Sequence, residues 1–303
     1  YKLGETYGEF KRYVEEIAAY KKAVAIRPDY AEAYNNIGIA YGELGRHADA
    51  VDAYKKAVEL KPDYADAYYT MGNAYLRSGH HADALVAYER AIGIRPEFAE
   101  VYVNMGNAYG ELGRHADAIA SCKKAIAIKP DFPEAYYCMG IAHKDLGQYA
   151  DALVAYDKAI AIKPHYAKAY HNMGSVYLRL GHHADALVAC KKAIAIAPDF
   201  PITYVNLGTA YGDLGRHADA LVAYKKAITI KPDLAEAYFG MGITYRKLGR
   251  HADALAAHKK SIAIKPDYAE AYYALGETYG ELKRYVEEIA AYKKAVAIKP
   301  DYV

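Results

Sequence analysis

The chain has 303 residues, of which 53% are hydrophobic, and a formal net charge of +2 at pH 7. This balanced charge gives no sign of a nucleic-acid or membrane partner, and no apolar run approaches the roughly 18 residues that a membrane-spanning helix needs. No signal peptide is visible and the first residue is not methionine, so we interpret the sequence as a fragment or a processed product. The compartment stays open, with the cytoplasm favoured.

A period of 34 residues runs along the whole chain. It is set by proline at positions 28, 62, 96, 130, 164, 198, 232, 266 and 300. Such a period is typical of arrays in which one small unit stacks on the next. We count Ala31 as position 1 of a repeat. The expected organisation is a single array over 1–303, with repeats at 1–30 (partial), 31–64, 65–98, 99–132, 133–166, 167–200, 201–234, 235–268 and 269–302.

The first half of each repeat predicts an amphipathic helix. In the repeat 31–64, apolar residues recur at helical spacing. Asp29 precedes this helix and Glu32 follows three residues later, which predicts a capping box at its start. Gly45 can take the left-handed backbone conformation that ends a helix. The predicted apolar face consists of Tyr34, Ile37, Gly38 and Tyr41.

The second half of each repeat predicts another helix of about 14 residues. Its apolar face carries Ala50, Tyr54, Ala57 and Val58, and Pro62 blocks its continuation. The glycine on the first helix and the alanines on the second let the two helices approach closely, while tyrosine rings fill the space beside them. One pair leaves an apolar face exposed, and stacking on the next pair covers it.

This pattern resembles the signature of the tetratricopeptide repeat (TPR) family, through Tyr34-x2-Ile37-Gly38-x2-Tyr41, Ala50, Tyr54, Ala57 and Pro62. The resemblance covers the whole chain. It implies an all-α fold, an alpha-alpha superhelix in which antiparallel helix pairs form a right-handed TPR solenoid. It also implies a concave groove, lined mainly by the first helices, that binds a peptide or protein segment.

If the first helices line a groove, position 6 of each repeat faces it. Four repeats carry asparagine there. An amide can donate and accept hydrogen bonds at once, which suits an extended peptide backbone. The series is similar to the asparagine ladder in the repeat arm of O-linked N-acetylglucosamine transferases, although asparagines that are merely solvated are the alternative. The residues are Asn36, Asn104, Asn172 and Asn206.

Basic residues on the same face are further candidates for the groove. Asn172 with Lys168 and Arg179 comes nearest to the clamp with which some members of the family hold a C-terminal carboxylate. Solvated surface charge is the alternative interpretation. The basic candidates are Arg77, Lys168, Arg179 and Arg246.

No pattern indicates catalysis, a metal or a cofactor. Six histidines share position 17, and neither that spacing nor their adjacent pairs would build a tetrahedral metal site, so we expect them to pack beside the turn. Cys122 and Cys190 share one repeat position, which indicates buried packing rather than a disulfide or metal site, and Cys138 stands at a different repeat position. The histidines are His47, His81, His115, His183, His217 and His251.

The two ends of the chain are nearly identical, residues 1–30 matching 273–302. Both keep apolar residues where a polar capping repeat is expected. The chain is therefore either cut from a longer array or able to stack end to end as an open filament. Sedimentation that showed a monomer at high concentration would argue against stacking.

Three functions follow from these patterns. The leading hypothesis is a non-enzymatic scaffold that binds a peptide or protein segment in its groove. The second is a structural subunit of a head-to-tail superhelical filament. The third is the targeting arm of a larger transferase.

Overall fold

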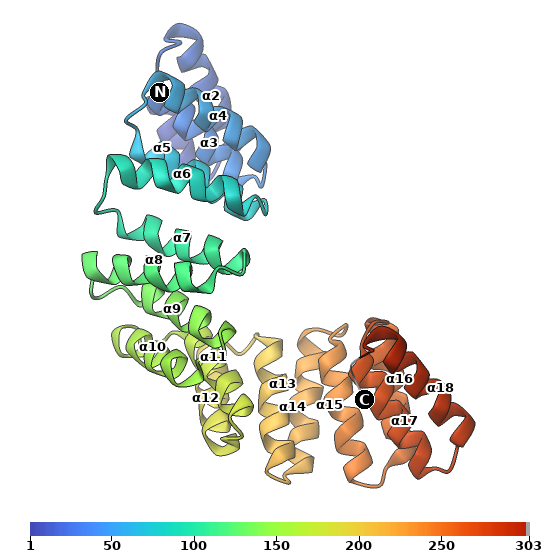
Figure 1. Cartoon of the computed structure of the whole chain (residues 1–303). Coiled ribbons are helices and arrows are strands. Elements are labelled where there is room, and N and C mark those ends of the chain that lie inside the picture. The colour runs from blue at the N-terminus through green and yellow to red at the C-terminus, as the bar shows by residue number, and fades with distance from the viewer. Residues whose placement is uncertain (301–303) are drawn as a thin grey trace. The chain divides into compact units, whose positions relative to one another are not determined.

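The computed structural model describes residues 1–300 and places eighteen α-helices and no strand among them. These helices form two compact bodies, each taken by itself below (Figure 1). The N-terminal body, residues 1–162, holds α1 to α10, and the C-terminal body, from Lys163 onward, holds α11 to α18. Asp301 and Tyr302 of the last predicted repeat, and the trailing Val303, lie outside the described residues. A single solenoid over 1–303 stays a prediction.

Each repeat supplies an odd-numbered first helix and an even-numbered second helix. The N-terminal body contains α1 (Lys2–Glu9), α2 (Tyr13–Ile26), α3 (Ala31–Glu43), α4 (His47–Leu60), α5 (Ala65–Arg77), α6 (His81–Ile94), α7 (Ala99–Glu111), α8 (His115–Ile128), α9 (Pro133–Asp145) and α10 (Tyr149–Ile162). The C-terminal body contains α11 (Ala167–Arg179), α12 (His183–Ile196), α13 (Pro201–Asp213), α14 (His217–Ile230), α15 (Ala235–Lys247), α16 (His251–Ile264), α17 (Ala269–Glu281) and α18 (Tyr285–Ile298).

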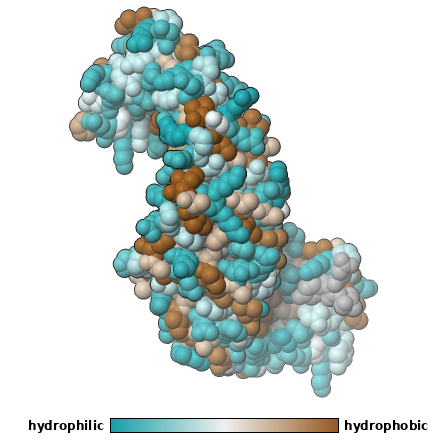
Figure 2. All heavy atoms as spheres, turned by 60° about the vertical axis from the view of Figure 1, so that its left-hand side comes forward, coloured by the Kyte–Doolittle hydropathy of each residue, from teal (hydrophilic) through white to brown (hydrophobic). Residues whose placement is uncertain are grey.

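The helices stack in sequence order within each body, as the predicted all-α superhelix of helix pairs requires (Figure 1). Each first helix packs on the second helix of its own repeat, and that second helix packs on the next first helix. First helices of adjacent repeats also touch, as α3 touches α5 and α13 touches α15. The first helices therefore form one continuous face in each body. On the face shown in Figure 2, hydrophobic atoms lie in patches between hydrophilic side chains.

The predicted close approach of the two helices is confirmed, and one ring accounts for it. The Tyr54 ring lies against the bare backbone of Gly38, where an added Cβ would stand 2.5 Å from the Tyr54 Cε1. Tyr88 lies in the same way against Gly72, where the distance is 2.4 Å. Because real Cβ atoms do not approach this closely, only glycine admits the ring at these positions.

Replacing either of two glycines of the N-terminal body with alanine is expected to change stability in opposite directions. Gly72→Ala gains about 1 kcal/mol of helix propensity, but overpacking against the Tyr88 ring costs about 1–3 kcal/mol. We expect a net loss of stability. Gly42→Ala meets no atom of the described chain within 4 Å and should gain up to about 1 kcal/mol. Denaturant unfolding of both variants checks this, and equal stability for the two would contradict it.

The first helices end as predicted, at a glycine in the left-handed region. Gly45 has a φ of 72°. Its N–H donates to Gly42 O at 3.0 Å, and the Arg46 N–H donates to Tyr41 O at 2.9 Å, which is a Schellman motif. Equivalent glycines of six later repeats share the positive φ, and Lys11 and Lys283 adopt it in the two matching end repeats. A lysine there is conformationally disfavoured relative to glycine.

The predicted capping box is wrong. The helix α3 begins at Ala31 with Tyr30 at the N-cap, and no side chain of the described residues caps it. Asp29 lies one residue too early, in the turn before the helix. The N-cap position is instead occupied by an aromatic ring, which stacks on the ring of Tyr1 with 4.7 Å between centroids. Packing of this partly buried ring has therefore displaced the polar cap.

Candidate functional site

Among residues 1–300, hollows open at three places on the face formed by the first helices, each between the first helices of two adjacent repeats. We name them after the glycine at position 12 that each contains: the Gly42, Gly110 and Gly212 hollows. No atom of the described chain lies within 4 Å of a Cβ placed on Gly42 or Gly110, and the nearest to Gly212 is the Ala220 Cβ at 4.0 Å. A long side chain at position 12 would occupy this space. Other repeats carry one there: Leu76, Lys144, Leu178 and Arg246.

The Gly42 hollow lies between α3 and α5 and has a volume of about 210 Å³. Glu43 on one wall and Arg77 on the other give it one acid and one base. Arg77 is a predicted groove residue, and the structure places it here. The remaining lining residues are Ile39, His47, Tyr54, Thr70, Asn73 and Ala74.

The Gly110 hollow lies between α7 and α9 and has a volume of about 170 Å³. Its charged side chains, Glu111 and Asp145, are both acidic, and no lysine or arginine is among the described residues that line it. Ile141 and Ala142 give it an apolar wall. Asp145 Oδ1 already lies 3.3 Å from Lys144 Nζ, so Glu111 is the main acid for a group that is apolar along its length and positively charged at its end. The remaining lining residues are Gly106, Asn107, His115, Ala118 and Cys138.

The Gly212 hollow lies between α13 and α15 in the C-terminal body and has a volume of about 310 Å³. A second glycine, Gly240 at position 6, also lines it and leaves room for the Tyr224 ring, because a Cβ there would lie 2.4 Å from the Tyr224 Cζ. Burial raises the pKa of Tyr224 to about 12, so its hydroxyl is neutral. The remaining lining residues are Val205, Thr209, Asp213, Glu236, Phe239, Ile243, Thr244, Lys247 and Tyr268.

The asparagines at position 6 join adjacent repeats. The Asn36 amide donates to the hydroxyls of Tyr1 at 3.0 Å and Tyr20 at 3.2 Å, both from the preceding repeat. The Asn104 amide donates to Asn73 Oδ1 at 2.7 Å. The donor side of these two amides is therefore used inside the stack, so a purely solvated asparagine does not describe them. Asn172 and Asn206 lie half-buried at the equivalent positions of α11 and α13.

Comparisons with known proteins agree with this architecture from residue 12 onward. Profiles described as "TPR repeat" or "Tetratricopeptide repeat" match residues 12–45, 40–79, 72–113, 99–132, 121–154, 142–181, 167–200, 202–267 and 241–303. The chain belongs to the tetratricopeptide repeat family. No curated protein matches the sequence.

Two solved structures share the TPR fold. One, titled "Crystal structure of APC/C hetero-tetramer Cut9-Hcn1", has a TM-score of 0.69 at 18% identity over 88% of this chain. The present chain spans about half of that one, 52% of its length. The other is a tetratricopeptide repeat protein from Parabacteroides merdae ATCC 43184, with a TM-score of 0.63 at 20% identity, covering 82% of this chain and 98% of that one. Identities this low show the fold alone.

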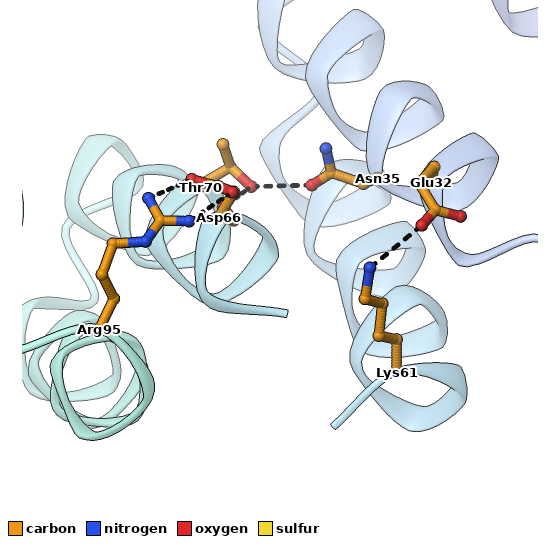
Figure 3. Close-up of polar contacts among 6 residues, drawn as sticks. All are labelled: Glu32, Asn35, Lys61, Asp66, Thr70 and Arg95. Carbon is orange, nitrogen blue, oxygen red and sulfur yellow. Dashed lines mark hydrogen bonds and ion pairs between the residues drawn. The ribbon is translucent and has the colours of Figure 1, made fainter. Parts of the chain in front are cut away.

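Acidic side chains at position 2 of several TPR repeats pair with a base that follows the second helix of the same repeat. Glu32 Oε1 lies 3.2 Å from Lys61 Nζ, and Asp66 binds Arg95 through two contacts of 2.9 and 3.0 Å (Figure 3). Hydrogen bonding by its own backbone N–H, then by Lys61, lowers the pKa of Glu32. These pairs are partly exposed and contribute little stability, but they reduce the free negative charge on the face of the first helices.

The three basic residues predicted for the groove of the C-terminal body differ in their exposure to solvent and in their ion pairs. Lys168 and Arg179 are exposed on α11, with Asn172 between them on the same helix. The Arg246 guanidinium instead lies between two glutamates of the next first helix, 2.9 Å from Glu277 and 3.1 Å from Glu281. Its charge is therefore balanced within the stack.

The position-17 histidines lie half-buried at the start of each second helix, beside the turn as expected. Two of them face a carboxylate on the next first helix: His183 Nδ1 is 3.4 Å from Asp213, and His251 Nδ1 is 3.1 Å from Glu281. Within residues 1–300, no three His, Cys, Asp or Glu side chains gather in a way that could hold a metal ion. In the same range, no helix combines the length and apolar character needed to cross a membrane.

Sequence reasoning missed the glycines at position 12, because a helix glycine was interpreted only as a packing or ending residue. Their signal is in the sequence: this position is glycine in some repeats and a long side chain in others. It also missed a stack of arginine on tyrosine that recurs beside six turns of the described residues, as where the Arg46 guanidinium lies 4.5 Å from the Tyr41 ring centroid. That arginine follows the tyrosine by five residues in most repeats.

Proposed function

We propose that this TPR array is a non-enzymatic scaffold that binds an extended peptide segment along the face of its first helices. The observation that carries the proposal is the recurrence of a hollow at the same repeat position, beside Gly42, Gly110 and Gly212. An extended segment presents its side chains at regular intervals, and within the N-terminal body the Gly42 and Gly110 hollows, at one register, would receive two of them in order.

The linings favour a particular ligand chemistry. The Gly212 hollow offers Phe239, Tyr224 and Ile243 and suits a large apolar side chain. The Gly110 hollow offers an apolar wall with Glu111 and Asp145 and suits lysine or arginine. The occupant of the N-terminal body is thus a segment with a basic residue. Glu32 is paired with Lys61, so its negative charge on the face of the first helices is largely balanced. The peptide would therefore be selected by the hollows rather than by a general negative charge of that face.

Filling one hollow tests the proposal. Gly110→Leu places at position 12 the residue that Leu76 and Leu178 already provide elsewhere, so the helix should tolerate it. Peptides selected from a random library against the intact chain should lose at least about tenfold in affinity, as the loss of one buried side-chain contact implies. The matched control is Gly93→Leu on α6, where a Cβ meets no atom of the described chain within 4 Å; it should change affinity less than twofold. Calorimetric titration gives both values.

Two outcomes would overturn the proposal: a library that yields no binder, or binders indifferent to leucine at Gly42, Gly110 and Gly212 alike. Selected peptides without lysine or arginine would refute the assignment of the Gly110 hollow. Asn104→Ala is a poorer test of the proposed asparagine ladder. That amide also holds Asn73 of the preceding repeat, so its loss weakens the stack as well as any contact with a ligand.

End-to-end association stays a second prediction, supported by one comparison. The helices α2 and α18 have the same sequence. Ile17 on α2 is 7% exposed beneath α3, whereas its equivalent Ile289 on α18 is 54% exposed. The surface of α18 is thus of the kind that a following first helix covers. A role as the targeting arm of a larger transferase stays an alternative that rests on the sequence resemblance alone.

A further inference from the structure

Two cysteine side chains meet where the repeat 99–132 packs on the repeat 133–166. Cys122 comes from α8 and Cys138 from α9, and both are free thiols, 0% and 4% exposed. A Cβ built on Gly106 would lie 2.8 Å from the sulfur of each. The Cys138 thiol donates a hydrogen bond to Val103 O at 3.9 Å. The two sulfurs are therefore neighbours across a joint between repeats.

The same joint is built differently elsewhere in the chain. In the N-terminal body, the ring of Tyr20 at position 24 meets the amide of Asn36 at position 6 of the next repeat. Cysteine replaces both partners only at Cys122 and Cys138. Cys190 also stands at position 24, is 0% exposed, and is followed by Asn206 at position 6. The chain thus contains a buried cysteine without a second cysteine at the equivalent position, which serves as an internal control.

The Gly110 hollow gives one of the two thiols a route to solvent. Cys138 is among the residues that line this hollow, whereas Cys122 is fully buried behind it. A small molecule that enters the hollow therefore meets Cys138 first. The two cysteines thus differ in access, which sets an order for any reaction that begins from solvent.

We propose that Cys122 and Cys138 are a site of reversible disulfide formation, with a peroxide as the oxidant. The Cys138 sulfur attacks one peroxide oxygen, which gives Cys138 sulfenic acid and water. The Cys122 sulfur then attacks the sulfenic sulfur, and the hydroxyl leaves with the Cys122 proton as a second water. Two thiols thus lose two electrons and two protons in all, and hydrogen peroxide is reduced to two waters.

The bond would tie α8 to α9 and close a loop of 15 intervening residues, 123–137. Such a loop stabilises mainly by restricting the unfolded chain. The neighbouring Cys138 thiol, and then burial, raise the pKa of the Cys122 thiol, which disfavours its thiolate. Attack by Cys122 on the sulfenic sulfur should therefore become faster as the pH rises.

The test is oxidation of the folded chain with hydrogen peroxide, followed by thiol counting in denaturant and peptide mass mapping. Of the three cysteines, two should be lost together as a peptide that joins Cys122 to Cys138, while Cys190 stays reduced. Dithiothreitol should restore all three. Amide exchange of α8 and α9 should slow in the oxidised protein.

Two variants separate the proposal from general oxidation. Cys138→Ala copies Ala274, which stands at the same repeat position, so the fold should accept it; it should abolish the disulfide and leave Cys122 reduced. Cys190→Ala should form the disulfide as the parent does. Oxidation of Cys190 as fast as the pair, or sulfinic and sulfonic products without a disulfide, would overturn the proposal, and so would a pair that stays reduced until the chain unfolds.

Discussion

Replacing Tyr88 with alanine is expected to lower the free energy of unfolding by about 3–5 kcal/mol, as truncation of a buried aromatic side chain does. The ring is 0% exposed and lies against Gly72. Its hydroxyl donates to Asn73 Oδ1 at 2.8 Å, and that oxygen also accepts from Asn104. The variant therefore leaves a cavity between α5 and α6 and disturbs the link to the next repeat.

The measurement is denaturant unfolding together with amide hydrogen exchange. In a repeat array, stability is a sum of repeats and their interfaces, so we expect faster exchange in α5 to α8 and little change in the C-terminal body. Tyr88→Phe removes only the hydroxyl and should cost about 1 kcal/mol. Tyr285→Ala is the exposed control, since Tyr285 is 60% exposed on α18. Equal costs for Tyr88→Ala and Tyr285→Ala would contradict the prediction.

The architecture could be predicted because it depends on residues that act within one repeat. Gly38 admits the ring of Tyr54 sixteen residues later, and Gly45 ends the helix that contains Gly38. The close contact and the helix end both recur every 34 residues in most repeats. A prediction made for one repeat is therefore supported by the sequence of the others. The family, the helix pairs and the positions of the turns follow from them.

The capping box failed because two local preferences compete for one position. Asp29 could satisfy the first backbone N–H groups of α3, but only by moving Tyr30 out of its contact with Tyr1. The partly buried, stacked ring outweighs the cap, which is worth about 1 kcal/mol. The sequence shows both residues and does not show the contact that decides between them.

The role of the asparagines depends on the neighbouring repeat and was harder to foresee. Asn36 was interpreted from its place on the helix, which put it on the face of the groove. Its partners, Tyr1 and Tyr20, come from a preceding helix pair and meet it only when the repeats are stacked. The hollows arise in the same way, since the space beside Gly42 is bounded on its other side by the next repeat, which contributes Arg77 to the lining.

The second large effect expected is a loss of stability between about pH 6.5 and pH 4, caused by one histidine. His258 is 0% exposed on α16, at the position where most repeats carry tyrosine. Its ring lies against Gly242, where a Cβ would stand 2.4 Å from the His258 Cε1. Neither ring nitrogen has a hydrogen-bond partner in the part of the chain that the structure describes.

Burial, and then the charge of Arg246, lower the pKa of His258 from 6.5 to about 4. The unfolded chain accepts a proton below pH 6.5, while the folded chain keeps this ring neutral until about pH 4. Above pH 6.5 the His258 ring is neutral in both states and does not reduce the free energy of unfolding. Between pH 6.5 and pH 4 only the unfolded chain gains the proton, so the free energy of unfolding falls progressively. Over this interval the loss amounts to roughly 3 kcal/mol, at 1.36 kcal/mol per pKa unit.

The test compares the chain with His258→Phe, whose ring does not titrate, by denaturant unfolding from pH 7 to pH 4. Glu277 and Glu281 beside Arg246 are present in both chains, so their own protonation cancels in the difference between the two curves. The variant should become the more stable of the two as the pH falls, with faster exchange in α15 to α18 of the parent chain alone. Parallel curves would mean that His258 reaches water in the folded state, contrary to its burial between Gly242 and Phe239.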